Sequence, residues 1–350
     1  MRFAMRFCLL LCVILAAAGN LRAEDSESTG KRIRAAIIKS IPLLEKGAAG
    51  SADQRKCFTC HNQAAPVFAL VEARGRGFTI DQENLKRQLQ HAADHLKRGK
   101  KNYLAGKGQG GSVFTAGYAL LALEAGGHKP DERTAAVTHY LLEHQKDMKH
   151  WRMHSNRPPT SGSDFTATYL ALRGLAAFGV KDQSEKILNR KETVRQWLLK
   201  QSPSDTEDHV YRLRAASYID IDEGSDGDKE QEALRKKARA ELLDLQRKDG
   251  GWAQKSDMKS DAYATATALV ALLREGGLPS DHAAIRRGTR YLLDTQEKDG
   301  SWHVVTRAKG FQKHFESGFP HGKDQFISIA ASSWATLALV LTLPESTDED

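Results

Sequence analysis

The chain alternates six times between two kinds of helical segment. One kind is rich in Ala and Thr and is apolar on nearly every side; in the fifth copy Ala264, Leu269 and Leu272 leave few positions suited to water. A helix that is apolar almost all round is buried on most sides. The six segments of this kind begin at Cys57, Ser112, Ser163, His209, Ser260 and Ser328.

Longer and more charged stretches lie between these segments. In the last of them Ile285, Leu292 and Leu293 recur at helical spacing, while Arg286 and Arg290 take other faces. One apolar stripe predicts a helix with one buried face. The six amphipathic stretches span residues 31–44, 83–98, 131–145, 185–201, 229–246 and 281–296.

Six alternations of a surface helix with a buried helix predict an all-α chain that forms two concentric rings, an α6/α6 toroid. The buried helices form the inner ring and the amphipathic helices form the outer ring. Runs of alternating β-branched residues, which indicate strands, hardly occur. An open solenoid of helical hairpins is the alternative, but six pairs without a polar capping repeat favour closure. We expect one toroid domain over residues 24–344 and a disordered acidic tail over 345–350.

The links between outer and inner helices carry a repeated sequence. "LLDLQRKDGGWAQ" (242–254) and "YLLDTQEKDGSWHV" (291–304) each combine Gln, a Lys-Asp-Gly turn and Trp, and "LLEHQKDMKHW" (141–151) is a degraded copy. Gly250 and Gly300 suit the positive φ that such a turn requires. We expect Trp252 and Trp302 to stack back over the helix end, with the indole N–H donating to a carbonyl.

In these Gln-Trp links, the chain resembles the squalene cyclase-like superfamily of terpene cyclase and prenyltransferase repeats. The resemblance covers nearly all of the chain after residue 23 and implies the α6/α6 toroid. It does not extend to cyclisation chemistry, because the acid motif DxDDTA of those cyclases is missing. Asp164 in "SDFTAT" and Asp261 in "SDAYATAT" each stand alone at the matching position, and aromatic residues are only 7% of the chain.

The N-terminus has the layout of a secretory signal peptide. Arg2 and Arg6 precede an apolar run from Cys8 to about Ala18, and a short polar region ends at Ala23. The run is shorter than the roughly 20 residues that a bilayer span needs, so we expect cleavage after residue 23, no stable membrane span, and a periplasmic or otherwise exported protein. Loss of the three arginines of residues 1–23 lowers the formal charge from +8 to +5. The charges of the remaining chain are mixed in sign along the helices, which indicates no nucleic-acid surface.

Residues 57–61, Cys-Phe-Thr-Cys-His, match the attachment motif of a c-type haem. In that motif Cys57 and Cys60 would bind the haem vinyl groups, and His61 would ligate the iron. Three other readings remain open. A zinc site would need a fourth ligand from elsewhere, a redox dithiol expects a βαβ setting, and a disulfide would close only a very small loop.

The motif lies at the start of the first inner helix, so one covalent haem would sit over the mouth of the toroid where all outer-to-inner links meet. The last link is the longest and could fold across that mouth. We therefore expect the second axial ligand to be His321, then His303, then His154; other candidates in the links are His150, Met153, His209, Met258 and His314. Glu316, His321 and Asp324 could alternatively supply acid-base chemistry, although a plain lid is the simpler reading of this loop.

Taken with the fold, the chain resembles a family of exported bacterial proteins that combine cyclase-type repeats with one cytochrome c motif. This resemblance implies haem binding and electron transfer with an unidentified redox partner protein. Two alternatives stay open. One is a haem-dependent oxidoreductase acting on a lipophilic or isoprenoid-like substrate in the toroid cavity, and the other is a haem-free binding scaffold.

Overall fold

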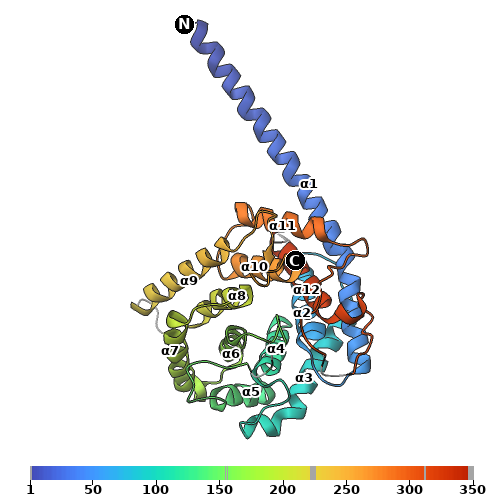
Figure 1. The fold of residues 1–350 in the computed structure, drawn as a ribbon, viewed down its shortest axis with the longest axis vertical. Helices are drawn as coiled ribbons and strands as arrows, with labels where there is room; N and C mark the ends of the chain where they lie inside the picture. The colour runs from blue at the N-terminus through green and yellow to red at the C-terminus, as the bar shows by residue number, and fades with distance from the viewer. Residues whose placement is uncertain (1, 154, 156, 221–225, 311–312, 346–350) are drawn as a thin grey trace.

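The structure, a computed structural model, describes residues 2–153, 155, 157–220, 226–310 and 313–345, with side chains from Glu27 onward except at 226–228. The described residues form two rings of helices (Figure 1). The inner helices are α2 (Ala65–Gly75), α4 (Ser112–Ala125), α6 (Asp164–Phe178), α8 (Thr206–Ala215), α10 (Ala262–Arg274) and α12 (Gln325–Leu341). The outer helices are α1 (Arg2–Gln54), α3 (Gln82–Leu104), α5 (Glu132–Glu143), α7 (Ser184–Lys200), α9 (Asp226–Asp244) and α11 (Ala283–Thr295).

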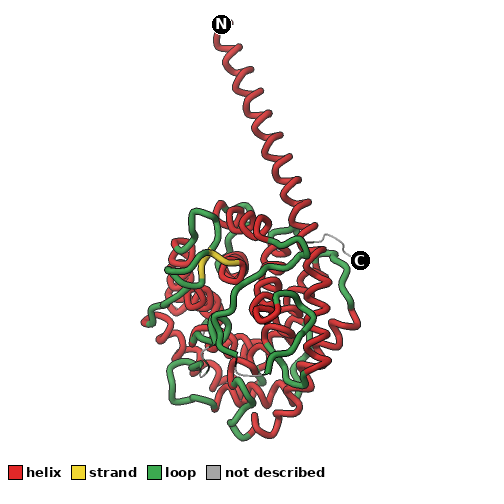
Figure 2. Tube along the Cα trace, turned by 45° about the vertical axis from the view of Figure 1, so that its right-hand side comes forward, coloured by secondary structure: helices red, strands yellow, loops and turns green. Residues whose placement is uncertain are grey.

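Short elements complete the links between the rings. A π-helical turn η1 (Cys60–Ala64) precedes α2, and 3-10 turns lie at η2 (Lys181–Gln183), η3 (Ala216–Tyr218) and η4 (Gly322–Asp324). The strands β1 (Trp252–Ala253) and β2 (Ser260–Asp261) pair antiparallel, with Trp252 opposite Asp261 (Figure 2). The scarcity of strand signals in the sequence agrees with a described sheet of only two short strands.

The inner ring is closed. Each inner helix packs against its neighbours, and α12 packs against α2, where the rings of Phe68 and Trp334 meet edge to face at 5.9 Å. The expected α6/α6 toroid is therefore confirmed, and the open solenoid is not what the chain forms. Among the described residues, the span Gly322–Leu341, which comprises η4 and α12, is the one helical stretch long and apolar enough to cross a bilayer, but 89% of it is buried within the ring, as in a core helix.

The Gln-Trp links form the contacts expected from their sequence. The indole N–H groups of Trp252 and Trp302 each donate to the carbonyl oxygen ten residues earlier, at 2.8 Å, and Trp151 in the degraded copy does the same. All three indoles are fully buried. Gly250 and Gly300 have φ of 87° and 98°, so the turn requires glycine at both positions.

Helix α1 is longer than the amphipathic stretch expected over residues 31–44. It runs without a break from Arg2 to Gln54, and its first half leads away from the rings (Figure 1). Its first buried core residue is Ile33. Cleavage after residue 23 stays a prediction, and five of the six residues of the expected acidic tail, 346–350, lie outside the described residues.

Candidate functional site at the inner-helix N-termini

The Cys-x-x-Cys-His motif spans the entrance to the first inner helix. Cys57 lies in a bend after α1, and Cys60 begins the π-helical turn η1. Thr59 caps this turn, because its hydroxyl accepts a hydrogen bond from the backbone N–H of Asn62 at 3.3 Å. Helix α2 begins four residues after His61 rather than directly after it, because the π turn comes first, and π turns are frequent at functional sites.

One face of the outer helix α3 holds the motif's first residues in place. His91 Nε2 lies 3.2 Å from the carbonyl oxygen of Cys57, the N–H of Phe58 donates to His95 Nδ1 at 3.5 Å, and Arg98 donates to the carbonyl of Lys56. Positions 91, 95 and 98 share one face of a helix. A histidine on an outer helix is expected to face water, but His95 is 6% exposed and packs on the Phe58 ring.

The two thiols differ in exposure. Cys57 is exposed, Cys60 is half-buried, and both are free thiols. Cys60 Sγ lies 3.5 Å from His61 Nδ1. Burial raises the pKa of the Cys60 thiol to about 12. Burial also lowers the pKa of His61 to about 4, and the positive charge of Arg157 acts in the same direction. Cys60 is therefore a neutral thiol and His61 a neutral imidazole at neutral pH.

The long link before α12 lies beside the motif, and aromatic rings fill the space between them. The rings of His61 and Phe326 lie 5.2 Å apart, and His314 and Phe315 pack on the other sides of Phe326 at 6.2 and 5.3 Å. Arg55, just before the motif, lies over the Phe315 ring at 4.7 Å and donates to the carbonyl oxygen of Lys313 at 3.0 Å. His314 of this link thus shares the Phe326 ring with His61 of the motif.

The first two candidates for the second axial ligand lie in a different cluster. The His303 and His321 rings stack at 4.6 Å, and their nitrogens lie within 4.8 Å of a Glu297 carboxylate oxygen. His321 Nε2 is 2.8 Å from Ser301 Oγ, and His303 Nε2 is 3.0 Å from Asp324 Oδ2. Within the described part of the chain, no recorded contact of His321 reaches Cys57, Cys60 or His61.

The remaining candidates have structural partners or cannot be placed. His154 lies outside the described residues. His150 Nε2 is 3.0 Å from Asp164 Oδ2, and the backbone N–H of Met153 donates to the other oxygen of Asp164 at 2.7 Å. His209 lies 3.8 Å from a Glu241 oxygen, and Met258 is half-buried. The proposed acid-base set of the last link is split as well, because Glu316 lies near His314 at 3.7 Å and Asp324 bonds His303.

Sequence reasoning missed Glu207, which lies at the centre of this mouth. It is 5% exposed, and its carboxylate accepts from Thr166 Oγ1 at 3.1 Å and from the Tyr263 hydroxyl at 3.2 Å. Burial, with Asp205 nearby, raises its pKa well above 4.5. A signal was present in the sequence. Glu207 is the second residue of α8, and the second residue of α6 and of α10 is a buried aromatic, Phe165 and Tyr263, so an acid stands where an aromatic side chain recurs.

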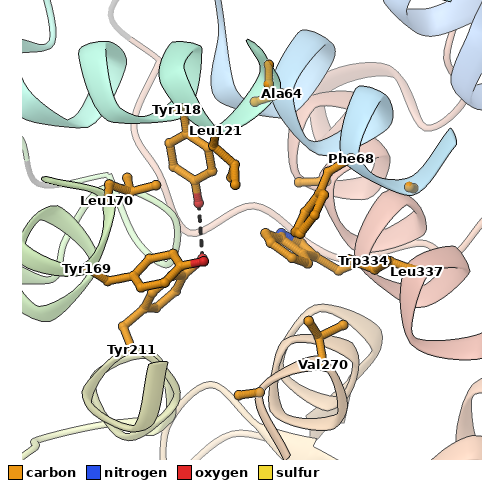
Figure 3. Packing of buried hydrophobic residues seen from close by; sticks show 14 of the residues in the cluster. Ala64, Phe68, Tyr118, Leu121, Tyr169, Leu170, Tyr211, Val270, Trp334 and Leu337 are labelled. Carbon is orange, nitrogen blue, oxygen red and sulfur yellow. Dashed lines mark hydrogen bonds between the residues drawn. The ribbon is translucent and has the colours of Figure 1, made fainter. Parts of the chain in front are cut away.

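Aromatic side chains fill the ring below Glu207. Tyr118 and Tyr211 hydrogen-bond to each other at 3.1 Å across the centre, beside Tyr169, and Phe68 and Trp334 face them (Figure 3). All five are 2% exposed or less. The low overall aromatic content therefore does not leave the centre of the ring without aromatic residues.

Comparison with known proteins agrees with this architecture. Solved structures with the same arrangement include the type II terpene cyclase MstE from Scytonema in complex with merosterolic acid A, with a TM-score of 0.56 at 13% identity over 91% of this chain and 99% of that chain. The fold is the α/α toroid of the terpene cyclases. A glycosidase shares it too, with a TM-score of 0.54 at 12% identity over 88% of this chain and 98% of that chain, so this likeness defines the fold alone.

Sequence similarity is confined to part of the chain. Residues 222–336 match the squalene-hopene cyclase C-terminal domain. The chain is 32% identical over 123 residues to the squalene–hopene cyclase of Bradyrhizobium diazoefficiens and 44% identical over 70 residues to the copalyl diphosphate synthase of Streptomyces anulatus. These matches cover 30% and 19% of this chain, and only 17% and 12% of the two cyclases.

The residues that stand in the cyclase acid position do structural work here. Asp261 caps α10 by accepting from the N–H of Ala264 at 3.0 Å, and Asp164 holds His150 and Met153 as described above. Each lies at the start of its inner helix without a second carboxylate of a DxDD pattern beside it in the sequence. Similarity to cyclases over the C-terminal residues thus does not bring the acid motif with it.

Proposed function

We propose that the protein is an exported c-type haem protein that transfers electrons. The observation that carries this proposal is the Cys57-x-x-Cys60-His61 motif, held at the mouth of the ring with Cys57 exposed and Cys60 half-buried. A free thiol at each attachment position and a histidine directly after the second thiol are what haem attachment requires.

The surroundings of His61 fit such a group. Its Nδ1 faces Cys60 Sγ, so Nε2 is left as the ligand nitrogen, and its neutral form is the form that binds metals. Phe326 and Phe315 supply apolar surface beside it. When bound, the haem would supply one-electron chemistry at its iron.

The chain's own residues would hold and shield that group. The contacts of His91, His95 and Arg98 fix the backbone of residues 56–58, which sets where the first thiol lies. The closed ring provides a rigid frame, and the link residues 313–316 cover one side of the mouth. Burial and polarity of such a pocket tune a haem potential.

A second candidate is a haem-dependent oxidoreductase acting on a lipophilic molecule. The buried Glu207 beside Tyr263, above an aromatic centre, favours it, because a neutral carboxylic acid in an apolar site can donate a proton. The Scytonema terpene cyclase, which has the same fold, is solved in complex with merosterolic acid A, so in that protein the fold holds an organic molecule. A haem-free binding scaffold would follow if the two thiols bind nothing.

The test is an oxidised and a reduced absorption spectrum, with an intact mass, of full-length protein produced in an export compartment that attaches haem. We expect a Soret band, a mass gain of one haem, and a mature chain that begins at Glu24. Cys57→Ala/Cys60→Ala should abolish both haem signals, whereas Ser51→Ala, outside the motif, should keep them. A folded, colourless wild-type protein would overturn the proposal.

Carbon monoxide then separates the two haem candidates. An electron carrier with both axial positions filled should show little change in its ferrous spectrum when carbon monoxide is added. An enzyme with an open position should bind carbon monoxide and shift its Soret band. The second result would favour the oxidoreductase.

A further inference from the structure

The opposite mouth of the ring, where the inner helices end, contains a cavity of about 460 Å³. Its position is defined by ion pairs between helix ends: Arg173 of α6 with Glu124 of α4, and Arg214 of α8 with Glu275 at the end of α10. The lining residues come from α6, η3, α9 and the end of α10, and they are Arg173, Ser217, Tyr218, Arg235, Arg274 and Glu275.

Two of the lining arginines are fixed by one aromatic ring. The guanidinium groups of Arg173 and Arg274 lie 5.1 and 4.6 Å from the centre of the Phe68 ring. Arg173 also donates to Glu124 at 2.6 Å and to the Tyr169 hydroxyl at 2.7 Å. Arg274 also pairs with Glu72 of α2. Because a guanidinium has five N–H donors, both arginines are pre-organised by these contacts and still have N–H groups for a ligand.

Several buried polar atoms at this cavity lack a hydrogen-bond partner among the residues whose side chains the structure describes. They are Arg235 Nε and Ser217 Oγ, with Arg214 Nη1 close behind the lining, on a side chain that is fully buried. Buried donors are normally hydrogen-bonded, so a set of unused donors around a cavity indicates a ligand rich in acceptors. Arginine from three separate elements matches the oxygens of a phosphate group.

One hydrogen-bond acceptor in the lining narrows the class of ligand further. Glu275 lines the same cavity. Its Oε1 accepts from Arg214 at 3.1 Å, while its Oε2 has no partner among the described side chains. A carboxylate oxygen would repel a fully deprotonated anion but would accept a hydrogen bond from a P–OH group. We propose that this cavity binds a phosphate group that carries a proton, either free phosphate or a phosphate monoester.

The proposal is independent of the haem, because the cavity lies at the other end of the inner helices from Cys60 and His61. A comparison of sulfate with phosphate tests the proposal, since sulfate has the same shape as phosphate but no proton to donate at neutral pH. The volume of the cavity exceeds that of a single phosphate ion, which leaves room for the organic part of a monoester.

The experiment is calorimetric titration of the full-length protein with inorganic phosphate, sulfate and glycerol phosphate at pH 6.5 and low ionic strength. We expect saturable binding of phosphate that is at least fivefold tighter than that of sulfate. Tighter binding of glycerol phosphate than of phosphate would identify an ester as the ligand, and weaker binding would identify the free ion. Absence of saturable phosphate binding, or equal affinity for sulfate, would overturn the proposal.

Variants locate the site. Arg235→Gln should weaken phosphate binding at least fivefold, and it should fold because Arg235 is half-exposed and its ion pair among the described side chains is with Glu232 on its own helix, at 3.5 Å. Ser217→Ala removes a hydroxyl that has no partner in the described part of the chain, and it should weaken binding less. Arg239→Gln is the matched control, since Arg239 lies one turn along α9 and donates to the Gly276 carbonyl at 2.8 Å instead of lining the cavity. Equal weakening by Arg239→Gln would show a nonspecific charge effect and overturn the assignment.

Discussion

The side-chain amide of Gln296 donates to the carbonyl oxygen of Ala36 at 2.9 Å, which joins the last Gln-Trp link to the first helix of the ring. The same amide donates to Gly300 within its own turn at 3.0 Å. Gln246 makes the equivalent pair of bonds, to Gly250 and to Ala284 of the next outer helix. The Gln of each full motif thus links successive repeats, and in the last copy that linkage closes the ring.

Gln296→Ala should therefore destabilise the protein. The substitution leaves two carbonyl oxygens without their donor, and each lost bond of this kind costs about 0.5–1.5 kcal/mol. We expect a loss of about 1–3 kcal/mol in the free energy of unfolding, measured by urea unfolding followed by circular dichroism.

Gln201→Ala is the control for this prediction. Gln201 caps the end of α7 at the corresponding place, but it is exposed, and the one bond its amide donates within the described residues is to the adjacent Ser202 carbonyl at 3.4 Å. Its replacement should change stability by less than about 0.5 kcal/mol. An equal loss in both variants would show that the Gln296 bonds contribute nothing specific.

The sequence was sufficient for the fold because the fold repeats. Trp252 and Trp302 recur in the same turn with the same spacing, so one local rule predicted both indole hydrogen bonds and, in weaker form, that of Trp151. Apolar periodicity likewise separated inner from outer helices, since burial on all sides and burial on one side leave different patterns.

The site was less predictable because it depends on contacts between distant segments. Nothing local to His95 indicated that it would pack on Phe58, 37 residues earlier, instead of facing water. The last link gave a similar difficulty, since its histidines divide between the Phe326 cluster and the Glu297 cluster. Chain direction within a long link is set by tertiary packing, which spacing along the sequence does not encode.

The two thiols should react at different rates in protein produced without haem attachment. Cys57 is exposed, whereas Cys60 is half-buried and its pKa is raised to about 12, so little thiolate is present at pH 8. We expect iodoacetamide to modify Cys57 at least tenfold faster than Cys60, measured by peptide mass mapping over time. In denaturant the two rates should converge, and equal rates in the folded protein would contradict this environment for Cys60.

His321→Ala should leave the spectrum of the haem-loaded protein unchanged, whereas His314→Ala should alter it. His321 is held by Ser301 and stacked on His303, while His314 shares the Phe326 ring with His61. The measurement is the ferric and ferrous absorption spectrum of each variant, with unfolding midpoints as the check on folding. A changed spectrum in His321→Ala alone would contradict this prediction and support His321 as the second ligand, the first expectation drawn from the sequence.

Glu207→Gln should become more stable relative to the wild-type protein as the pH rises. The pKa of Glu207 is raised well above 4.5 in the folded state, so the folded protein keeps a proton that the unfolded chain has lost. The contribution of this group to stability is fully present below pH 4.5 and is lost as the pH rises toward the folded-state pKa. Glutamine mimics the protonated acid and does not titrate.

Urea unfolding at pH 5, 6, 7 and 8 measures the difference in the free energy of unfolding between Glu207→Gln and the wild-type protein. It should grow by up to about 1.4 kcal/mol per pH unit within the titration window, because one pKa unit corresponds to that free energy. Glu83→Gln, on the exposed face of α3, controls for loss of a carboxylate. If this difference were constant over pH 5–8, Glu207 would already be ionised in the folded ring. It would then have no proton to offer to a bound molecule.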